Sequence, residues 1–172
     1  QLKMQSGGED EKVEETARLS KGRLGWALQA LEDPDILKRR DETLSLIEQT
    51  AFASLEHRFS YAAELSRMSG VDRELAYEEL TLWLEWWRDI MIVKEGKYQH
   101  VINLSRMDMM AAIAASLTPS EIMSSVDAIL DTVGYLERNI NSRLALEELM
   151  LMLPRPVLMT ESFGTTSNGD AR

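Results

Sequence analysis

The sequence predicts an all-α protein built as a helical bundle. Apolar residues recur at intervals of three and four over most of the chain, which is the period of an amphipathic helix. Only four prolines interrupt the 172 residues, and alternating β-branched runs typical of strands are few. We therefore expect two short helices near the N-terminus, then a bundle from about residue 36 to residue 155.

Local signals place the boundaries of the expected helices. Residues 8–22 form a short segment with acidic residues in its first turn, and residues 23–33 form a second short helix. Asp33 followed by Pro34 is typical of a helix start and opens a long helix. Further signals predict a helix end at Ser69-Gly70, an extended stretch near residues 99–105, and a capping box in the segment Thr118-Pro119-Ser120-Glu121.

Residues 71–94 contain three of the four tryptophans of the chain. On a wheel at about 100° per residue, apolar side chains cover more than half of this helix, which predicts a central position with neighbours on at least two sides. Trp83 and Trp87 lie in the main apolar arc and are predicted to fill the core. Trp86 lies on a flanking stripe, which favours an edge or a protein interface.

Composition excludes several classes of function. A net charge of -10 disfavours sequence-independent binding to nucleic acid, which depends on Lys and Arg placed on phosphates. The absence of cysteine excludes disulfides and thiolate chemistry, and it fits a reducing, cytoplasmic location. No apolar run of 18 or more residues occurs, so no membrane span is expected. The start of the chain lacks the pattern of a signal peptide.

No catalytic, cofactor or metal site is expected from the motifs. The chain has two histidines, His57 and His100, and neither follows a Glu by three residues as in carboxylate-bridged metal bundles. Both are expected at the surface or at helix ends. Phosphate-binding loops and hydrolase elbows are also missing from the sequence. The fragment is therefore predicted to catalyse no reaction.

Residues 62–80 offer an alternative interpretation as a helix-turn-helix. A small-residue helix, a turn at Ser69-Gly70 and a second helix from Val71 have the required order. The second helix is net negative where a recognition helix would face phosphates. An ordinary helical hairpin is favoured, and a DNA-binding regulator remains the alternative from another class. A generic helical adaptor is a further one.

Four segments in order resemble a known family: LSKGRLGWALQALED, FSYAAELSRM, LTLWLEWWRDIMIVKEG and NINSRLALEELMLMLP. Together they look like the C-terminal region of bacterial DNA polymerase III clamp-loader subunits, most like the delta prime subunit. The resemblance covers about residues 15–155. Its most specific pieces are Leu82-Trp83 with Trp86-Trp87-Arg88-Asp89, and Asn139-Ile140-Asn141 with Leu144-Ala145-Leu146-Glu147.

The resemblance implies a non-catalytic oligomerisation domain, the helical collar that holds a ring of AAA+ subunits together for sliding-clamp loading in DNA replication. Residues 1–32 would be an N-terminal tail with the end of a lid domain, residues 33–158 the collar, and residues 159–172 a disordered tail. The implied partners are the gamma/tau and delta subunits, with the sliding clamp and primed DNA contacted only indirectly. No cofactor is expected.

A departure from the family pattern bears on which subunit is meant. ATP-binding relatives carry a nucleotide-sensing arginine within G-x-x-R-x-A-L, whereas this chain has Gly25 at that position and an arginine only at Arg23. This favours delta prime, with the gamma/tau collar as the alternative. The residues expected to contact neighbouring subunits are Trp86, Arg88, Asp89 and Arg143.

Overall fold

The structure is a computed structural model that describes residues 13, 16–20, 22, 24–138 and 140–156. Within those residues it is all-helical, and no strand occurs. The helices are α2 (Leu24–Glu32), α3 (Pro34–Phe52), α4 (Leu55–Val71), α5 (Arg73–Lys94), α6 (Met107–Ser116), α7 (Pro119–Glu137) and α8 (Ser142–Met152), with the short 3-10 helices η1 (Tyr98–His100) and η2 (Leu104–Arg106) between α5 and α6. The predicted fold class is confirmed at this level. The predicted tails and most of the first short helix lie outside the described residues.

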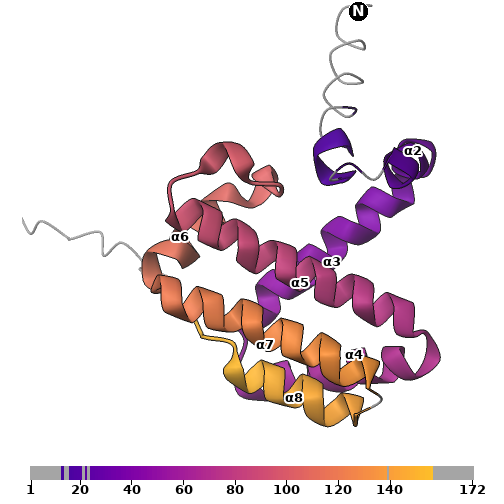
Figure 1. The fold of residues 1–172 in the computed structure, drawn as a ribbon, viewed down its shortest axis with the longest axis vertical. Helices are drawn as coiled ribbons and strands as arrows, with labels where there is room; N and C mark the ends of the chain where they lie inside the picture. The colour runs from indigo at the N-terminus through magenta and orange to yellow at the C-terminus, as the bar shows by residue number, and fades with distance from the viewer. Residues whose placement is uncertain (1–12, 14–15, 21, 23, 139, 157–172) are drawn as a thin grey trace, which may run out of the picture.

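Four of the helices, α4, α5, α7 and α8, form a closed antiparallel bundle (Figure 1). Each packs against its two neighbours around the ring: α4 on α5, α5 on α7, α7 on α8, and α8 back on α4. The hydroxyls of Ser66 and Ser142 are 2.9 Å apart, and Arg58 donates to the carbonyl of Leu153 at 2.7 Å. The end of α4 therefore lies beside the start of α8. This is an up-down-up-down arrangement, in which η1, η2 and α6 lie in the connection between α5 and α7.

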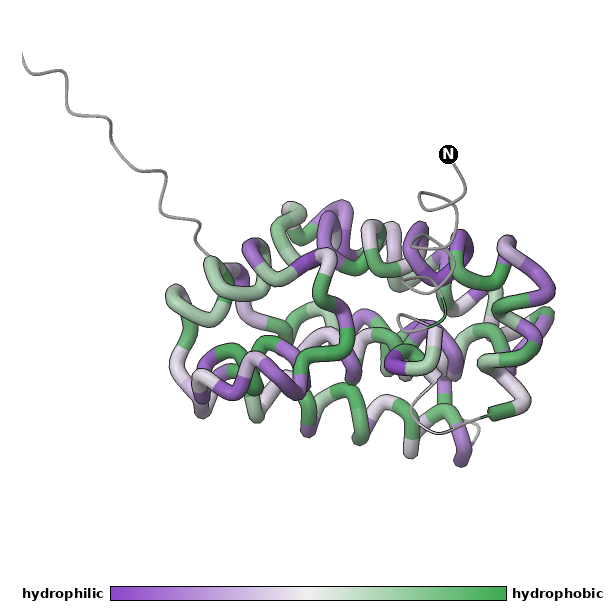
Figure 2. Tube along the Cα trace, turned by 90° about the horizontal axis from the view of Figure 1, so that it is seen from above, coloured by the Kyte–Doolittle hydropathy of each residue, from purple (hydrophilic) through white to green (hydrophobic). Residues whose placement is uncertain are grey.

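Helix α5 occupies the centre, as its apolar circumference predicts. It contacts α3, α4, α6 and α7. The side chains of Trp83, Trp86 and Trp87 are all fully buried in one hydrophobic core with residues from the surrounding helices. Figure 2 shows apolar and polar residues alternating along the helices, as amphipathic packing requires.

Predicted helix starts are confirmed where the signal is local. Asp33 accepts from the backbone N–H of Asp35, and Pro34 is the first residue of α3. Thr118 and Glu121 form the complete capping box of α7. Asn141 accepts from the N–H of Leu144 and caps α8.

The predicted helix end at Ser69-Gly70 is wrong. Helix α4 continues through Gly70 to Val71, and Asp72 both ends α4 and begins α5. The Asp72 carboxylate accepts from the N–H of Glu74 at 2.9 Å, so a side-chain cap supplies the boundary. The turn required by the helix-turn-helix interpretation is consequently not at Ser69-Gly70.

The connection between α5 and α6 also differs from expectation. Gly96 takes a left-handed conformation with φ of 70°, which fits the predicted turn. The next residues form η1 and η2 rather than an extended stretch. Lys94 then donates to the carbonyl of Ala114 at 2.7 Å, so the ends of α5 and α6 lie together and α6 runs in the same direction as α5.

Candidate functional site

The structure places the four predicted interface residues in two different environments. Trp86 and Asp89 are fully buried within the chain, which corrects the expectation that they lie at the surface. The side chains of Arg88 and Arg143 are 47% and 66% exposed. Only these two can present their side chains to another molecule without rearrangement. Their role as subunit contacts stays a prediction.

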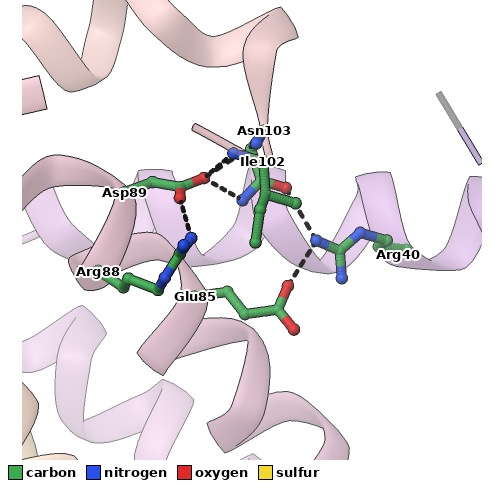
Figure 3. Close-up of polar contacts among 6 residues, drawn as sticks. All are labelled: Arg40, Glu85, Arg88, Asp89, Ile102 and Asn103. Carbon is green, nitrogen blue, oxygen red and sulfur yellow. Dashed lines mark hydrogen bonds and ion pairs between the residues drawn. The ribbon is translucent and has the colours of Figure 1, made fainter. Parts of the chain in front are cut away.

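Asp89 is the centre of a buried polar cluster (Figure 3). Its Oδ2 accepts from the backbone N–H of Ile102 at 3.0 Å, and from both the backbone N–H and the side-chain amide of Asn103 at 2.9 Å. Its Oδ1 accepts from Arg88 at 2.9 Å. A buried carboxylate needs such a set of donors to offset its lost hydration. Asp89 therefore fastens the connection before α6 to the middle of α5.

Arg40 extends this cluster to α3 (Figure 3). Its Nη2 donates to Glu85 at 2.6 Å and to the side-chain oxygen of Asn103 at 2.9 Å. The side chains of Arg40 and Glu85 are only 10% and 4% exposed. Charge-assisted bonds between residues so shielded from water join α3, α5 and the α5–α6 connection in one continuous network.

Arg106 makes a second tie between the same connection and α3. It donates to Glu48 and to the carboxylate of Asp41, both at 2.7 Å, and to the hydroxyl of Ser45 at 2.9 Å. Its side chain is 13% exposed. The planar guanidinium with its fixed set of donors suits this kind of multiple recognition.

A third buried group joins α4 to α5. The indole N–H of Trp83 donates to the hydroxyl of Tyr61 at 2.6 Å, and that hydroxyl donates to Glu79. Burial raises the pKa of Glu79, and the bond from Tyr61 opposes that rise. Burial and the neighbouring Glu79 carboxylate raise the pKa of Tyr61 well above its usual value. This arrangement stabilises the packing of two helices.

Arg58 closes the end of the bundle where α3 and α8 finish. Its guanidinium donates to the carbonyls at the end of α3 and to those at the end of α8, which belong to Thr50, Ala51, Met150, Leu153 and Pro154. The last carbonyls of a helix have no partner within the helix, and their partial negative charge favours a cation. Burial, more than the nearby Arg155, lowers the pKa of Arg58.

Within the described residues no group of His, Asp and Glu could hold a metal ion. His57 and His100 are exposed, as expected. Among the same residues, no helix combines the length and apolar character needed to cross a membrane.

Sequence reasoning missed two exposed leucines in the last motif segment. Leu144 is 61% exposed, and Leu151, seven residues further along α8, is 59% exposed. The intervening helix buries its other face, through Ala145, Leu146 and Leu149. A seven-residue spacing was the available signal, because positions i and i+7 share a helix face.

Comparison with known proteins adds no relative to this description. No family model, no curated protein and no solved structure matches the chain.

Proposed function

We propose that this chain is a non-catalytic oligomerisation module, the collar domain of a bacterial clamp-loader subunit of the delta prime type. The observation that carries the proposal is the outward face of α8, where Leu144 and Leu151 lie more than half exposed on either side of Glu147 and Glu148. A folded bundle gains nothing from leaving these side chains in water, whereas a partner helix would bury them. Leu144 also belongs to one of the motif segments on which the family resemblance rests.

The exposed cations support the same proposal. Arg88 belongs to the tryptophan motif, yet it contacts Asp89 through one nitrogen only and keeps about half of its side chain in solvent. Arg143, next to Leu144, pairs with Glu147 at 2.8 Å. Arginine is enriched in protein interfaces relative to the rest of the protein surface.

The uncharged surface of α2 is a further supporting feature. Leu24, Leu28 and Leu31 are 71%, 53% and 36% exposed, at positions that share one face of the helix. The chain as a whole carries a net charge of -10, so an apolar stripe of this kind stands out. In a clamp-loader subunit this helix would end the lid and would be covered by the AAA+ module.

Size exclusion with light scattering tests the proposal. The chain is mixed with the collar region of a gamma/tau subunit from the same organism, and we expect a defined hetero-oligomer. Leu144→Ser with Arg143→Ala should weaken the association, whereas Leu46→Ser with Arg67→Ala should not. Leu46 is 44% exposed, and Arg67 pairs with Glu64 much as Arg143 pairs with Glu147.

Two separate peaks at micromolar concentration would contradict the collar assignment. Binding of duplex DNA at low salt, declining steeply as salt rises, would favour the DNA-binding alternative instead.

A further inference from the structure

We propose that Arg40, Glu85, Asn103 and Asp89 act as a brace that sets the direction of an arm formed by α2 and the first half of α3. The arm comprises residues 24–39. Figure 1 shows α2 and part of α3 running away from the other helices. The four residues will be called the Arg40 brace.

The arm has few contacts of its own with the bundle. Among the helices whose bounds the structure describes, α2 contacts α3 alone. None of residues 34–43 is buried, and the first buried residue of α3 is Leu44. Apolar packing therefore begins only in the second half of α3, with Leu44, Ile47 and Ala51.

Arg40 lies one helical turn before Leu44. It is the residue nearest the start of α3 from which a hydrogen bond to α5 or to the α5–α6 connection is seen. Its bond to Glu85 reaches α5, and its bond to Asn103 reaches the α5–α6 connection. Asn103 is in turn fixed by Asp89 through two bonds of 2.9 Å. The brace thus connects Arg40 to α5, the central helix of the bundle, in two ways. One is the direct bond to Glu85, and the other passes through Asn103 to Asp89.

After Arg40, α3 is held by its buried apolar residues and by the bonds of Arg106, none of which reaches a residue before Asp41. Apolar contacts are not directional, whereas hydrogen bonds from a planar guanidinium are. The brace consequently adds a directional tie where the arm leaves the bundle. It therefore controls where the exposed leucine stripe of α2 lies relative to the bundle, whatever covers that stripe.

In a clamp-loader subunit the arm would lead into the preceding module, so the brace would couple the orientation of that module to the collar. That consequence rests on the proposed function. The mechanical role of the brace within this chain does not.

Spin-label distances in the 172-residue chain test the inference. The protein has no cysteine, so Gln29→Cys with Ser124→Cys introduces one label on the arm and one on α7. Ser60→Cys with Ser124→Cys reports on α4 and α7 within the bundle. Gln29, Ser60 and Ser124 are all exposed in the structure.

The test variant is Arg40→Met with Glu85→Gln, which removes both charges and leaves no unpaired ion in the interior. The matched control is Lys38→Met with Glu42→Gln, an exposed pair on the same helix whose atoms are 3.8 Å apart. We expect the test variant to widen the arm-to-bundle distance distribution by about twofold, since a segment with few buried contacts opens at little cost in free energy. The distribution within the bundle should keep its width, and the control should change neither.

An unchanged arm-to-bundle distribution in a folded test variant would overturn the inference. Loss of the distance within the bundle would overturn it as well, because the cluster would then be required for the fold rather than for the arm. Asn103→Ala provides a second reading. It removes the acceptor of Arg40 and the side-chain bond to Asp89, keeps the backbone bond to Asp89, and touches neither charge, so it should widen the arm distribution too. The spin-label distances are measured on the chain alone and do not depend on binding to a gamma/tau collar. They can therefore be interpreted even if the proposed function is wrong.

Discussion

Asp89 and Asn103 hold one another through two bonds to the same oxygen, one from the backbone N–H and one from the side-chain amide of Asn103, both 2.9 Å long. The pair links residues 14 positions apart in the sequence and is fully shielded from solvent at Asp89. It explains why an acidic residue lies in the centre of an apolar helix. The carboxylate accepts hydrogen bonds from backbone N–H groups of the α5–α6 connection, which lies against α5 before α6 begins.

Replacing Asp89 by Asn should destabilise the protein. The amide oxygen can still accept from Ile102 and Asn103, but the bonds lose the negative charge that strengthens them, and the amide NH2 then faces the guanidinium of Arg88. We expect a loss of about 1–3 kcal/mol in the free energy of unfolding, the range for weakening hydrogen bonds to a buried charged group. Urea denaturation followed by circular dichroism measures it. Asp127→Asn, at an exposed position of α7, should change stability by less than about 0.5 kcal/mol.

The tryptophans allow a matched comparison of indole hydrogen bonding. Trp83 and Trp86 are both fully buried on α5, but the N–H of Trp83 donates to Tyr61, whereas that of Trp86 has no acceptor. Replacement by Phe removes a similar volume in each case. Trp83→Phe should cost about 1 kcal/mol more than Trp86→Phe, the usual net value of a hydrogen bond. Equal losses in urea denaturation would contradict the bond to Tyr61.

Arg58 should be irreplaceable by Lys. Its guanidinium serves carbonyls from two helix ends, and an ammonium group cannot span both sets. We expect Arg58→Lys to lower the free energy of unfolding by about 2–3 kcal/mol, since several buried carbonyls lose their donor. Thermal unfolding measures the loss. Arg67→Lys is the control, because Arg67 is 67% exposed and bonds only Glu64. A mild effect at Arg58 would mean that water replaces the guanidinium.

The sequence was sufficient for features that depend on neighbouring residues. Thr118 and Glu121 are three residues apart, and their capping box is present as expected. The burial of Trp83 and Trp87 follows from the helix period alone. The end of α4 was misplaced because glycine is a frequent helix stop, but Asp72, two residues beyond Gly70, caps the next helix and allows α4 to continue.

Features that depend on distant residues could not be predicted in this way. Arg40 and Glu85 are 45 positions apart, and nothing local marks them as a pair. Asp89 was placed at the surface because an isolated acidic residue is nearly always exposed. Trp86 was placed at an edge because a wheel shows which side is apolar, but it does not show how many neighbours cover that side. The number of neighbours is a property of the tertiary packing, where α5 meets helices on several sides.

A glycine inside a helix predicts the close approach of another helix, but among the described residues no other helix comes this close to Gly134 in α7. A Cβ at Gly134 would come within 4 Å of one group only, the guanidinium of Arg138 on the same helix, at 3.2 Å. That group ends a flexible side chain and can move. Gly134→Ala should therefore stabilise α7 by about 0.5–1 kcal/mol, the difference in helix propensity. Differential scanning calorimetry measures it.

The contrasting substitution is Gly96→Ala. Gly96 has φ of 70°, a region that residues with a Cβ adopt at a cost of about 1 kcal/mol. It should lower the melting temperature although nothing lies within 4 Å of the added methyl group. If both alanine variants shifted the melting temperature in the same direction, the assigned conformation of one glycine would be wrong.

Glu79 should make a contribution to the stability of the folded protein that decreases as pH rises. Its pKa is raised by burial in the folded protein, so the folded state binds a proton more readily than the unfolded chain does. Between the unfolded value, about 4.3, and the raised value, the folded state carries more protons, and this contribution to stability falls as pH rises. Below the unfolded value the contribution is fully present, and above the folded value it is lost.

Glu79→Gln removes that contribution while its amide oxygen can still accept from the Tyr61 hydroxyl. The variant should therefore gain stability relative to the parent as pH rises from about 4.3 towards 7, because the parent alone must keep a half-buried carboxylate ionised. Urea midpoints of both proteins across this range provide the measurement. Glu78→Gln, at the neighbouring exposed position, should follow the parent at every pH. A difference between Glu79→Gln and the parent that stays constant with pH would show that the Glu79 carboxyl keeps its ordinary pKa, because the bond with Tyr61 then balances the effect of burial.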